Sequence, residues 1–270
     1  MAAEYSYPSK YTAAPTKSGK VLKVLIFFAI FCLAGELIWL LGIGPFRPFS
    51  QVNVIGAEDI SREEILITAG FTADLSYVSA DVREMEEALM EIVALESARV
   101  IKYYPGRLQI IVQKRQPVAS AFVVMNGSTV PVLFDSKGVI YRIGGEKRDE
   151  FLSSVLPVIS GLEIRDPYLG MKLPDLYIPL LEEIEKVKDS APNLLKIVSE
   201  IEINRKAFDN FDLILYPIHK KIRVRLSEFN EYMLQYALLI IEVLSSEESG
   251  IEVFDFRSGI ASYYPKGGAL

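Results

Sequence analysis

The chain of 270 residues has one cysteine, Cys32, and one histidine, His219. A single cysteine cannot form a disulfide within the chain, and zinc sites built from several Cys or His ligands are excluded. The sequence also lacks a G-x-S-x-G elbow, a P-loop and a dinucleotide-binding glycine motif. Because no signature supplies His219 with a carboxylate and a nucleophile, a solvated turn residue is the favoured interpretation. We therefore predict no enzyme activity, no metal and no cofactor.

Positive charge is also scarce, since 29 Lys and Arg residues face 35 Asp and Glu residues, for a net charge of -6. Phosphate binding requires clustered Lys and Arg side chains, so we predict no nucleic-acid partner. Half of the residues are apolar and 24% are charged, which is enough apolar material to bury a core. These properties, with no catalytic motif, indicate a folded protein without a small-molecule substrate.

A long apolar run dominates the N-terminal part, where residues 24–43 contain a single charge, Glu36. A helix of 20 residues is about 30 Å long, which matches the hydrocarbon thickness of a bilayer. No small-residue cleavage site follows the run, so we predict an uncleaved transmembrane helix rather than a signal peptide. Arg47 is the one basic residue in the first dozen positions after the run, whereas four lysines precede it: Lys10, Lys17, Lys20 and Lys23. The positive-inside rule therefore predicts a cytoplasmic N-terminus and extracytoplasmic C-terminal domains.

Glu36 has two interpretations that stay open at this stage. An acidic side chain at mid-span costs roughly 2.5 to 3.5 kcal/mol, and less toward the end of the span. It is either a tolerated residue that reaches toward the membrane surface or a hydrogen-bonding partner for another transmembrane helix. Glu36 is thus a candidate residue for transmembrane pairing.

A cytoplasmic tail is predicted at residues 1–23, of which we expect residues 1–19 to be disordered, and two extracytoplasmic domains are predicted after the transmembrane helix. In residues 50–117, the order is strand, helix, helix, strand, strand. Ser61 with Glu64, and Asp81 with Glu84, have the spacing of helix caps. A type II turn is expected at Pro105-Gly106, and a helical stripe predicts these core residues: Val82, Met85, Leu89, Ile92 and Val93.

The second predicted domain covers residues 118–265, before a short tail at 266–270. Strands alternate with turns, residues 144–174 look rich in loops, and Pro179 is placed to open a helix. Ser227 is expected to cap a second helix. The stripe predicted for the buried side of that helix consists of Phe229, Tyr232, Met233, Tyr236, Ile240 and Val243. The fold class is therefore α+β, with a single N-terminal transmembrane helix and a mainly antiparallel second domain.

The segment DFRSGIASYYP, residues 255–265, predicts two strands around Ser258-Gly259 at the edge of a sheet. The second strand, expected at 260–264, carries no charge, although edge strands are normally blunted by charge or proline. It is either a short, harmless edge or a site where a partner adds a strand. Arg257 is expected to clamp a partner carboxylate or to brace Asp255. The candidate binding residues are Phe256, Arg257, Ser258, Ile260, Ser262, Tyr263 and Tyr264.

Several local motifs, in this order, resemble the FtsQ/DivIB family of bacterial cell-division proteins. Phe256 departs from the family's usual leucine at its position, and residues 144–174 have no clear counterpart. The resemblance covers roughly residues 20 to 265 and rests on VNVIGAEDIS at 52–61, YYPGRLQIIVQKRQPVA at 103–119, LFDSKGVIY at 133–141 and VFDFRSG at 253–259.

The resemblance implies a POTRA domain at 50–117 (β-α-α-β-β) and an FtsQ-type β domain at 118–265. It also implies a non-catalytic scaffold of the divisome, placed in the cytoplasmic membrane at the division septum. There it would recruit or regulate septal peptidoglycan synthesis through FtsB-like and FtsL-like partners, with the FtsB-like partner at the C-terminal region. The alternatives are a POTRA-containing secretion or envelope-assembly component and, less favoured, a membrane-anchored hydrolase.

Overall fold

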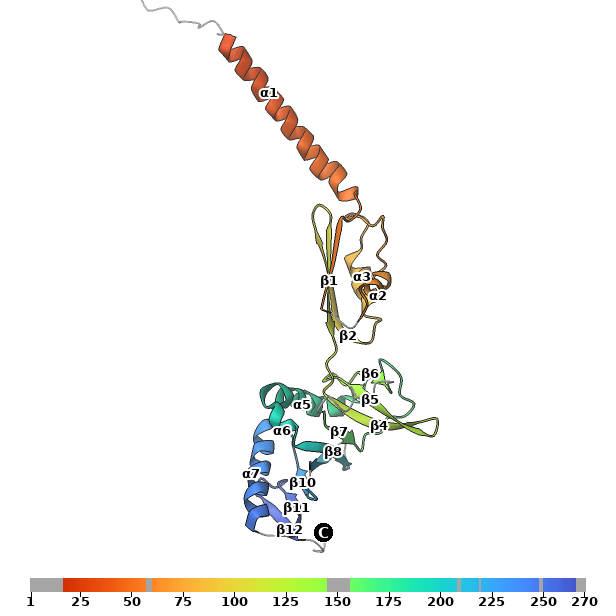
Figure 1. Cartoon of the computed structure of the whole chain (residues 1–270), viewed down its shortest axis with the longest axis vertical. Coiled ribbons are helices and arrows are strands. Elements are labelled where there is room, and N and C mark those ends of the chain that lie inside the picture. The colour runs from red at the N-terminus through yellow and green to blue at the C-terminus, as the bar shows by residue number, and fades with distance from the viewer. Residues whose placement is uncertain are drawn as a thin grey trace, which may run out of the picture. The chain divides into compact units, whose positions relative to one another are not determined.

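A computed structural model describes residues 17–56, 60–144, 156–207, 210–218, 220–247 and 250–265 (Figure 1). His219, most of the expected N-terminal tail and the tail at 266–270 lie outside these residues. The chain divides into two compact units, one made of residues 1–90 and 98–112 and the other of residues 91–97 and 113–270. Each unit is described by itself.

The first unit begins with α1 (Lys17–Ile38), which continues as a π-helical turn, η1 (Trp39–Ile43), and a 3-10 turn, η2 (Gly44–Phe46). One described helical stretch, Gly19–Phe46, is long and apolar enough to cross a membrane. Its large apolar side chains are exposed, as expected for a lipid-facing surface. The predicted span at 24–43 lies within this stretch.

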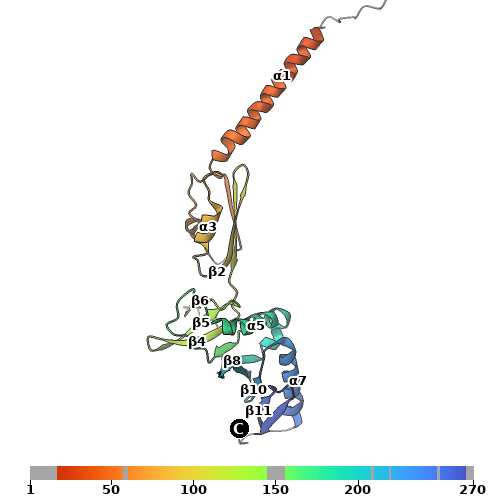
Figure 2. The ribbon, with the colours of Figure 1, turned by 180° about the vertical axis from the view of Figure 1, so that it is seen from behind.

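Three strands form the sheet of the first unit in the order β1-β3-β2. They are β1 (Gln51–Ile55), β2 (Leu95–Tyr103) and β3 (Arg107–Lys114), and β1 runs parallel to β3 from Gln51↔Arg107 to Ile55↔Ile111. The helices α2 (Arg62–Thr68) and α3 (Val82–Leu89) lie beside this sheet in both views (Figures 1 and 2). The predicted β-α-α-β-β order is confirmed.

Both predicted helix caps are present in the first unit. The Ser61 side chain accepts a hydrogen bond from the Glu64 backbone N–H at 3.1 Å, and Asp81 accepts from the backbone of Arg83 and Glu84. These bonds satisfy amide groups that have no partner inside the helix. Met85 and Leu89 are buried as predicted. However, α3 ends at Leu89, so Ile92 and Val93 do not extend its stripe.

The type II turn predicted at Pro105-Gly106 is wrong. Such a turn requires a positive φ angle at its third residue, and Gly106 does not have one. Instead, the Gly106 carbonyl accepts hydrogen bonds from the Ser50 backbone N–H at 2.9 Å and the Ser50 hydroxyl at 3.1 Å. These bonds to the residue preceding β1 orient the Gly106 peptide, which local sequence could not reveal.

Nine strands form the sheet of the second unit, in the order β12-β11-β10-β9-β8-β7-β4-β5-β6. Most neighbours are antiparallel, whereas the pairs β10–β11, β7–β8 and β4–β7 are parallel. The strand bounds are β4 (Ala119–Met125), β5 (Ser128–Phe134), β6 (Ile140–Ile143), β7 (Val158–Ser160), β8 (Val198–Arg205), β9 (Phe211–Pro217), β10 (Arg223–Leu226), β11 (Ile251–Asp255) and β12 (Ser262–Pro265).

The core of the second unit lies between this sheet and its helices. They are α5 (Ile178–Ser190), preceded by the 3-10 turn η3 (Asp175–Tyr177), then α6 (Pro192–Leu195) and α7 (Glu231–Glu247). Pro179 lies in the first turn of α5, as predicted. The helix side chains that face the sheet belong to one buried cluster with it, and include Leu180, Leu181, Ile184, Val187, Leu234, Ala237 and Ile241.

Two expectations for α7 are wrong. The helix begins at Glu231, and the Asn230 side chain, not Ser227, accepts a hydrogen bond from the Met233 backbone N–H at 2.8 Å. The buried positions are Leu234, Ala237 and Ile241, whereas Tyr232 and Val243 of the predicted stripe are exposed. Apolar residues occur on every side of this helix, so their spacing alone did not determine which side faces the core.

Candidate partner-binding edge

The C-terminal strand β12 is the outermost strand of the nine-stranded sheet and has one neighbour, β11. The two strands are antiparallel, with Val253↔Tyr264, Phe254↔Tyr263 and Asp255↔Ser262 as partners. On its other side, β11 pairs with β10 in parallel, as in Val224↔Phe254. In both views, α7 runs alongside β11 (Figures 1 and 2). The last described strand is therefore fixed to the sheet on one side only.

The turn between β11 and β12 lies at Ser258-Gly259, as predicted, whereas the bounds of the last strand differ from the prediction. Gly259 has φ +79, and its N–H donates to the Phe256 carbonyl at 3.1 Å. Its left-handed backbone is readily adopted by glycine, and the Ser258 hydroxyl donates to the Ile260 carbonyl at 3.4 Å. β12 begins at Ser262, so Ile260 lies in the connection and not in the predicted strand.

The side chains of β12 and its connection are open to solvent. Ile260 is 73% exposed, Tyr263 45% and Tyr264 36%, and Ser262 is also exposed. No residue of β12 carries a charge, so nothing in the strand itself opposes a further strand through charge repulsion. Aromatic residues are enriched at the centres of protein interfaces. The side chains and the edge position are thus compatible with strand addition.

Phe256 differs from the other candidates because its side chain is 1% exposed. Its ring lies 5.6 Å from that of Tyr236 on α7 in an edge-to-face arrangement and 6.5 Å from that of Phe254. A partner added at β12 would not contact this side chain. The expectation that Phe256 belongs to the binding surface is therefore corrected, since the residue anchors the end of β11 to α7.

Arg257 braces its own sheet, which is one of the two roles expected for it. Its guanidinium Nε donates to Asp255 Oδ1 at 2.9 Å, and its Nη1 donates to Asp212 Oδ2 on β9 at 2.8 Å. The Nζ of Lys206 contacts Asp212 Oδ1 at 2.6 Å, and Arg225 lies 3.9 Å from Asp255. This acidic and basic group, which we call the Arg257 cluster, connects β9, β10 and β11 just before the turn into β12.

The electrostatics of the Arg257 cluster favour charged carboxylates. The hydrogen bond from Arg257 holds the pKa of Asp255 below its ordinary value, although burial opposes this shift. Burial raises the pKa of Asp212, but the hydrogen bonds from Lys206 and Arg257 lower it by more, so the net shift is downward. Both carboxylates are therefore ionised near neutral pH and hold the arginine in place.

The Arg257 cluster could be predicted only in part from the sequence. Asp255 and Arg257 are two positions apart in one extended segment, which made a local pair plausible. Asp212 lies 45 residues before Arg257 in the sequence. The two side chains meet because the fold places β9 and β11 on either side of the short strand β10. Asp212 falls in a run of apolar strand residues, and this isolated charge was the one available signal.

Glu36, the other candidate residue, lies in α1 and is exposed. Among the described residues, no hydrogen bond or ion pair of its side chain is present. The Glu36 carboxyl group can therefore form hydrogen bonds at the membrane surface or with another helix.

Comparison with known proteins covers both units. Residues 47–115 match the model of the POTRA domain, FtsQ-type. The chain is 23% identical over 210 residues to the cell division protein DivIB of Bacillus cytotoxicus, a match of 77% of this chain and 74% of that protein. It is 32% identical over 133 residues to the cell division protein FtsQ of Mycolicibacterium smegmatis, covering 49% of this chain and 39% of that protein. These matches show that the chain is similar to the FtsQ and DivIB cell-division proteins, with an FtsQ-type POTRA domain at residues 47–115.

This similarity agrees with the order of the elements. The FtsQ-type POTRA match ends at residue 115, at the end of β3, and the nine-stranded sheet follows it. A further relative, the cell division protein FtsQ of Koribacter versatilis, is 27% identical over 155 residues, which is 57% of this chain and 42% of that protein. The resemblance seen in the sequence motifs is thereby confirmed, and the chain matches about two fifths of the length of these FtsQ relatives.

Proposed function

We propose that this chain is a non-catalytic, single-pass membrane scaffold of the bacterial divisome, which recruits or regulates septal peptidoglycan synthesis by binding other division proteins. Its similarity to cell-division proteins supports a role in division. The apolar helix Gly19–Phe46 supports the membrane anchor. By the lysine distribution, the N-terminus is cytoplasmic and both folded units are extracytoplasmic.

The observation that carries the proposed binding role is the open side of β12. Strand addition needs an edge with unsatisfied backbone groups and side chains that fix the register. β12 offers a strand that has one neighbour among the described residues, together with exposed Tyr263 and Tyr264 and no charge. The Arg257 cluster fixes the turn before it, so little ordering of this turn is needed when a partner binds. The proposed partner there is an FtsB-like protein, with an FtsL-like protein in the same assembly.

The decisive experiment measures binding of the full chain, in detergent micelles, to its FtsB-like partner. A lysine at the edge should oppose strand addition, so we expect Tyr263→Lys to weaken binding at least tenfold. Ser262→Pro and removal of residues 259–270 should have the same or larger effect. Tyr168→Lys is the matched control, because Tyr168 is 64% exposed in a loop of the same unit.

Full-strength binding by Tyr263→Lys and by the truncated chain, with unchanged melting curves, would contradict the binding site. In cells, a fluorescent fusion should concentrate at mid-cell and the truncated form should fail to support division. A uniform envelope distribution would instead favour a secretion or envelope-assembly role. A topology reporter joined after Leu270 should be active outside the cytoplasm.

Glu36 is proposed to pair with a transmembrane helix of a partner. A carboxyl group in the span is stabilised by a hydrogen bond to a neighbouring helix, with pair energies of about 1 kcal/mol in membranes. Glu36→Leu should therefore weaken association of the spans while insertion remains intact, and Glu36→Gln should retain most of it. Energy transfer between labelled helices measures the association. If the native chain, Glu36→Leu and Glu36→Gln associate equally, Glu36 does not take part in helix pairing.

A further inference from the structure

The strand β4 has very different neighbours on its two sides. It pairs with β5 over its whole length, from Ala119↔Phe134 to Met125↔Ser128. On the other side it meets β7 at a single position, Ser120↔Val158, after which the two strands diverge. The part of β4 from Ala121 to Met125 therefore has no strand on this side among the described residues.

The backbone groups of Phe122 and Val124 point into this gap. The N–H of Ser120 donates to the Pro157 carbonyl at 3.1 Å, so it faces the β7 side, and positions two and four residues later face the same side. Pro131, which is opposite Phe122, agrees with this direction. It has no N–H, and its carbonyl accepts from the Gly144 N–H at 2.8 Å on the side away from β4. No described residue binds the N–H or C=O groups that Phe122 and Val124 direct into the gap.

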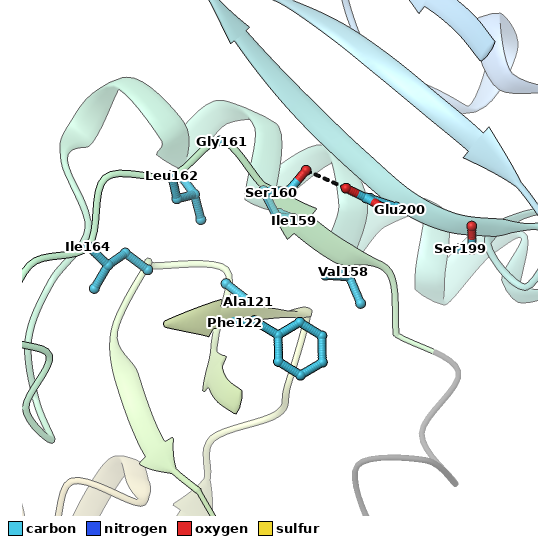
Figure 3. Close-up of a pocket in the computed structure, with 10 residues that line it drawn as sticks. All are labelled: Ala121, Phe122, Val158, Ile159, Ser160, Gly161, Leu162, Ile164, Ser199 and Glu200. Atoms are coloured by element: carbon cyan, nitrogen blue, oxygen red, sulfur yellow. Dashed lines mark hydrogen bonds between the residues drawn. The ribbon is translucent and has the colours of Figure 1, made fainter. Parts of the chain in front are cut away.

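The gap is a cavity of about 420 Å³, and Figure 3 shows the residues that line it. Phe122 and Val158 lie together at one end, whereas Leu162 and Ile164 lie at the other. Gly161 comes directly after β7. It has φ +79, and a Cβ atom there would lie 2.3 Å from the Ile203 carbonyl oxygen of β8. The glycine thus allows the chain to pass close to β8 at the end of β7.

Apolar side chains on β4 remain exposed beside the open backbone. Phe122 is 60% exposed and Val124 is 74% exposed, and the segment from Ala121 to Met125 contains no charge. Natural edge strands of this kind are normally covered or carry a charge or proline that prevents pairing. An uncovered apolar strand with free N–H and C=O groups is the combination that strand addition requires.

Negative charge borders the cavity on the β8 side. Glu200 accepts a hydrogen bond from the Ser160 hydroxyl at 2.5 Å, and Glu202 accepts one from the Tyr216 hydroxyl at 2.5 Å. In the part of the chain that the structure describes, neither carboxylate forms an ion pair. Burial first, and then Glu202 and Glu200, raise the pKa of Tyr216 to about 12. The two carboxylates therefore favour a positively charged group nearby.

We propose that the cavity between β4 and β7 is a second binding site, which takes an extended segment of another protein with apolar residues flanked by Lys or Arg. Its backbone would pair with Phe122 and Val124, its apolar side chains would cover Phe122, Leu162 and Ile164, and its basic residue would reach Glu200. A second copy of the chain is a poor occupant through its own β4, since that strand has no basic residue. This site is separate from β12 and does not depend on the proposed function.

The test uses the full chain in detergent micelles and a fluorescent peptide of sequence Lys-Val-Thr-Val-Ile-Val-Lys as the probe. Fluorescence anisotropy should show saturable binding, and replacing both lysines of the peptide by glutamate should weaken it at least tenfold. Val124→Pro removes an N–H that faces the cavity and should also weaken binding at least tenfold. Phe122→Ser and Glu200→Gln should each reduce affinity several-fold.

Thr129→Pro is the matched control. Thr129 pairs with Val124 across the same hairpin. Its N–H points away from the cavity, because backbone groups two residues apart face the same side and those of Pro131 face away from β4. This variant should bind the peptide normally, and so should the chain that lacks residues 259–270. Melting curves establish that each variant is folded.

Three results would overturn the proposal. The first is no saturable binding, and the second is equal loss with Val124→Pro and Thr129→Pro. The third is slow amide hydrogen exchange at Phe122 and Val124 in the free protein, which would mean that the cavity is already filled. Such protection would come from a second copy if it decreased on dilution, and from the chain itself if it did not. Rapid exchange that slows when the basic peptide is added is the expected result.

Discussion

β12 and β4 each lack a neighbouring strand on one side, yet the two open sides are built differently. At β12, charged groups of three other strands fix the turn that leads into the edge, and Phe256 beneath it is buried. At β4, the aromatic residue Phe122 faces solvent, and the carboxylate Glu200 lies across a cavity. The comparison shows that two edges with the same missing hydrogen bonds can differ in how firmly the surrounding residues hold them in place.

The largest expected contrast is between the two phenylalanines. Phe256→Ala removes a fully buried ring and should lower the free energy of unfolding by about 3 to 5 kcal/mol. Phe122→Ala removes a ring that is 60% exposed, so the change should stay within about 0.5 kcal/mol. Chemical denaturation of both variants measures this contrast. Similar losses would show that Phe122 is covered in solution.

Gly161 and Gly259 form a second matched pair, because both have φ +79. A Cβ atom at Gly161 would meet the Ile203 carbonyl oxygen at 2.3 Å, whereas nothing lies within 4 Å of one at Gly259. Strain at a left-handed position costs of the order of 1 to 3 kcal/mol. Gly161→Ala should therefore cost at least about 2 kcal/mol, and Gly259→Ala about 1 kcal/mol. Thermal unfolding distinguishes them, and equal shifts would mean that β7 can move to relieve the clash.

The last expected effect on stability, smaller than those of Phe256→Ala and Gly161→Ala, concerns the Arg257 cluster, whose arginine side chain is 36% exposed. Partial exposure screens the interaction, so Arg257→Ala should cost only about 1 kcal/mol near neutral pH. Because the folded pKa values of Asp212 and Asp255 are lowered, their contribution is complete above the unfolded value of about 3.9. It is lost as the pH falls through the folded values.

Unfolding measured between neutral pH and pH 2 checks this prediction. The difference between the native chain and Arg257→Ala should shrink below about pH 4. Arg225 and Lys206 still face the two carboxylates in the variant, so some dependence on pH should remain. A difference that stays constant across this range would show that Arg257 acts through packing.

The helices α3 and α7 show what the sequence could predict. In α3, apolar residues occupy one side, and Asp81 caps the helix at the expected position, so Met85 and Leu89 were correctly placed in the core. In α7, apolar residues occupy all sides. The side that is buried depends on where the sheet lies, and the prediction was consequently wrong for Tyr232 and Val243.

The strands show a similar limit. β4, β5 and the hairpin that joins them follow from alternation and from Asn126-Gly127, whose φ values are both positive. β7 was missed, because three residues in a segment rich in Gly and Pro give no periodic signal. The cavity beside β4 was missed as well, because it arises from the shortness of β7, which pairs with β4 at one position only. For the candidate site, the sequence predicted that the last strand lies at the edge of the sheet. It could not predict that Asp212 binds Arg257, because that contact depends on the order of the strands in the sheet.

The shortness of β7 also has a mechanical consequence. This strand of three residues connects β8 through β12 to the hairpin of β4 and β5, and its link to β4 is one bridging position. Resistance to pulling grows with the number of hydrogen bonds that must break together. The sheet should therefore part first between β4 and β7 when it is stretched across its strands. If the proposed partner binds at β12 while the proposed membrane helix holds the other end of the chain, tension would open the cavity at β4 before either hairpin yields.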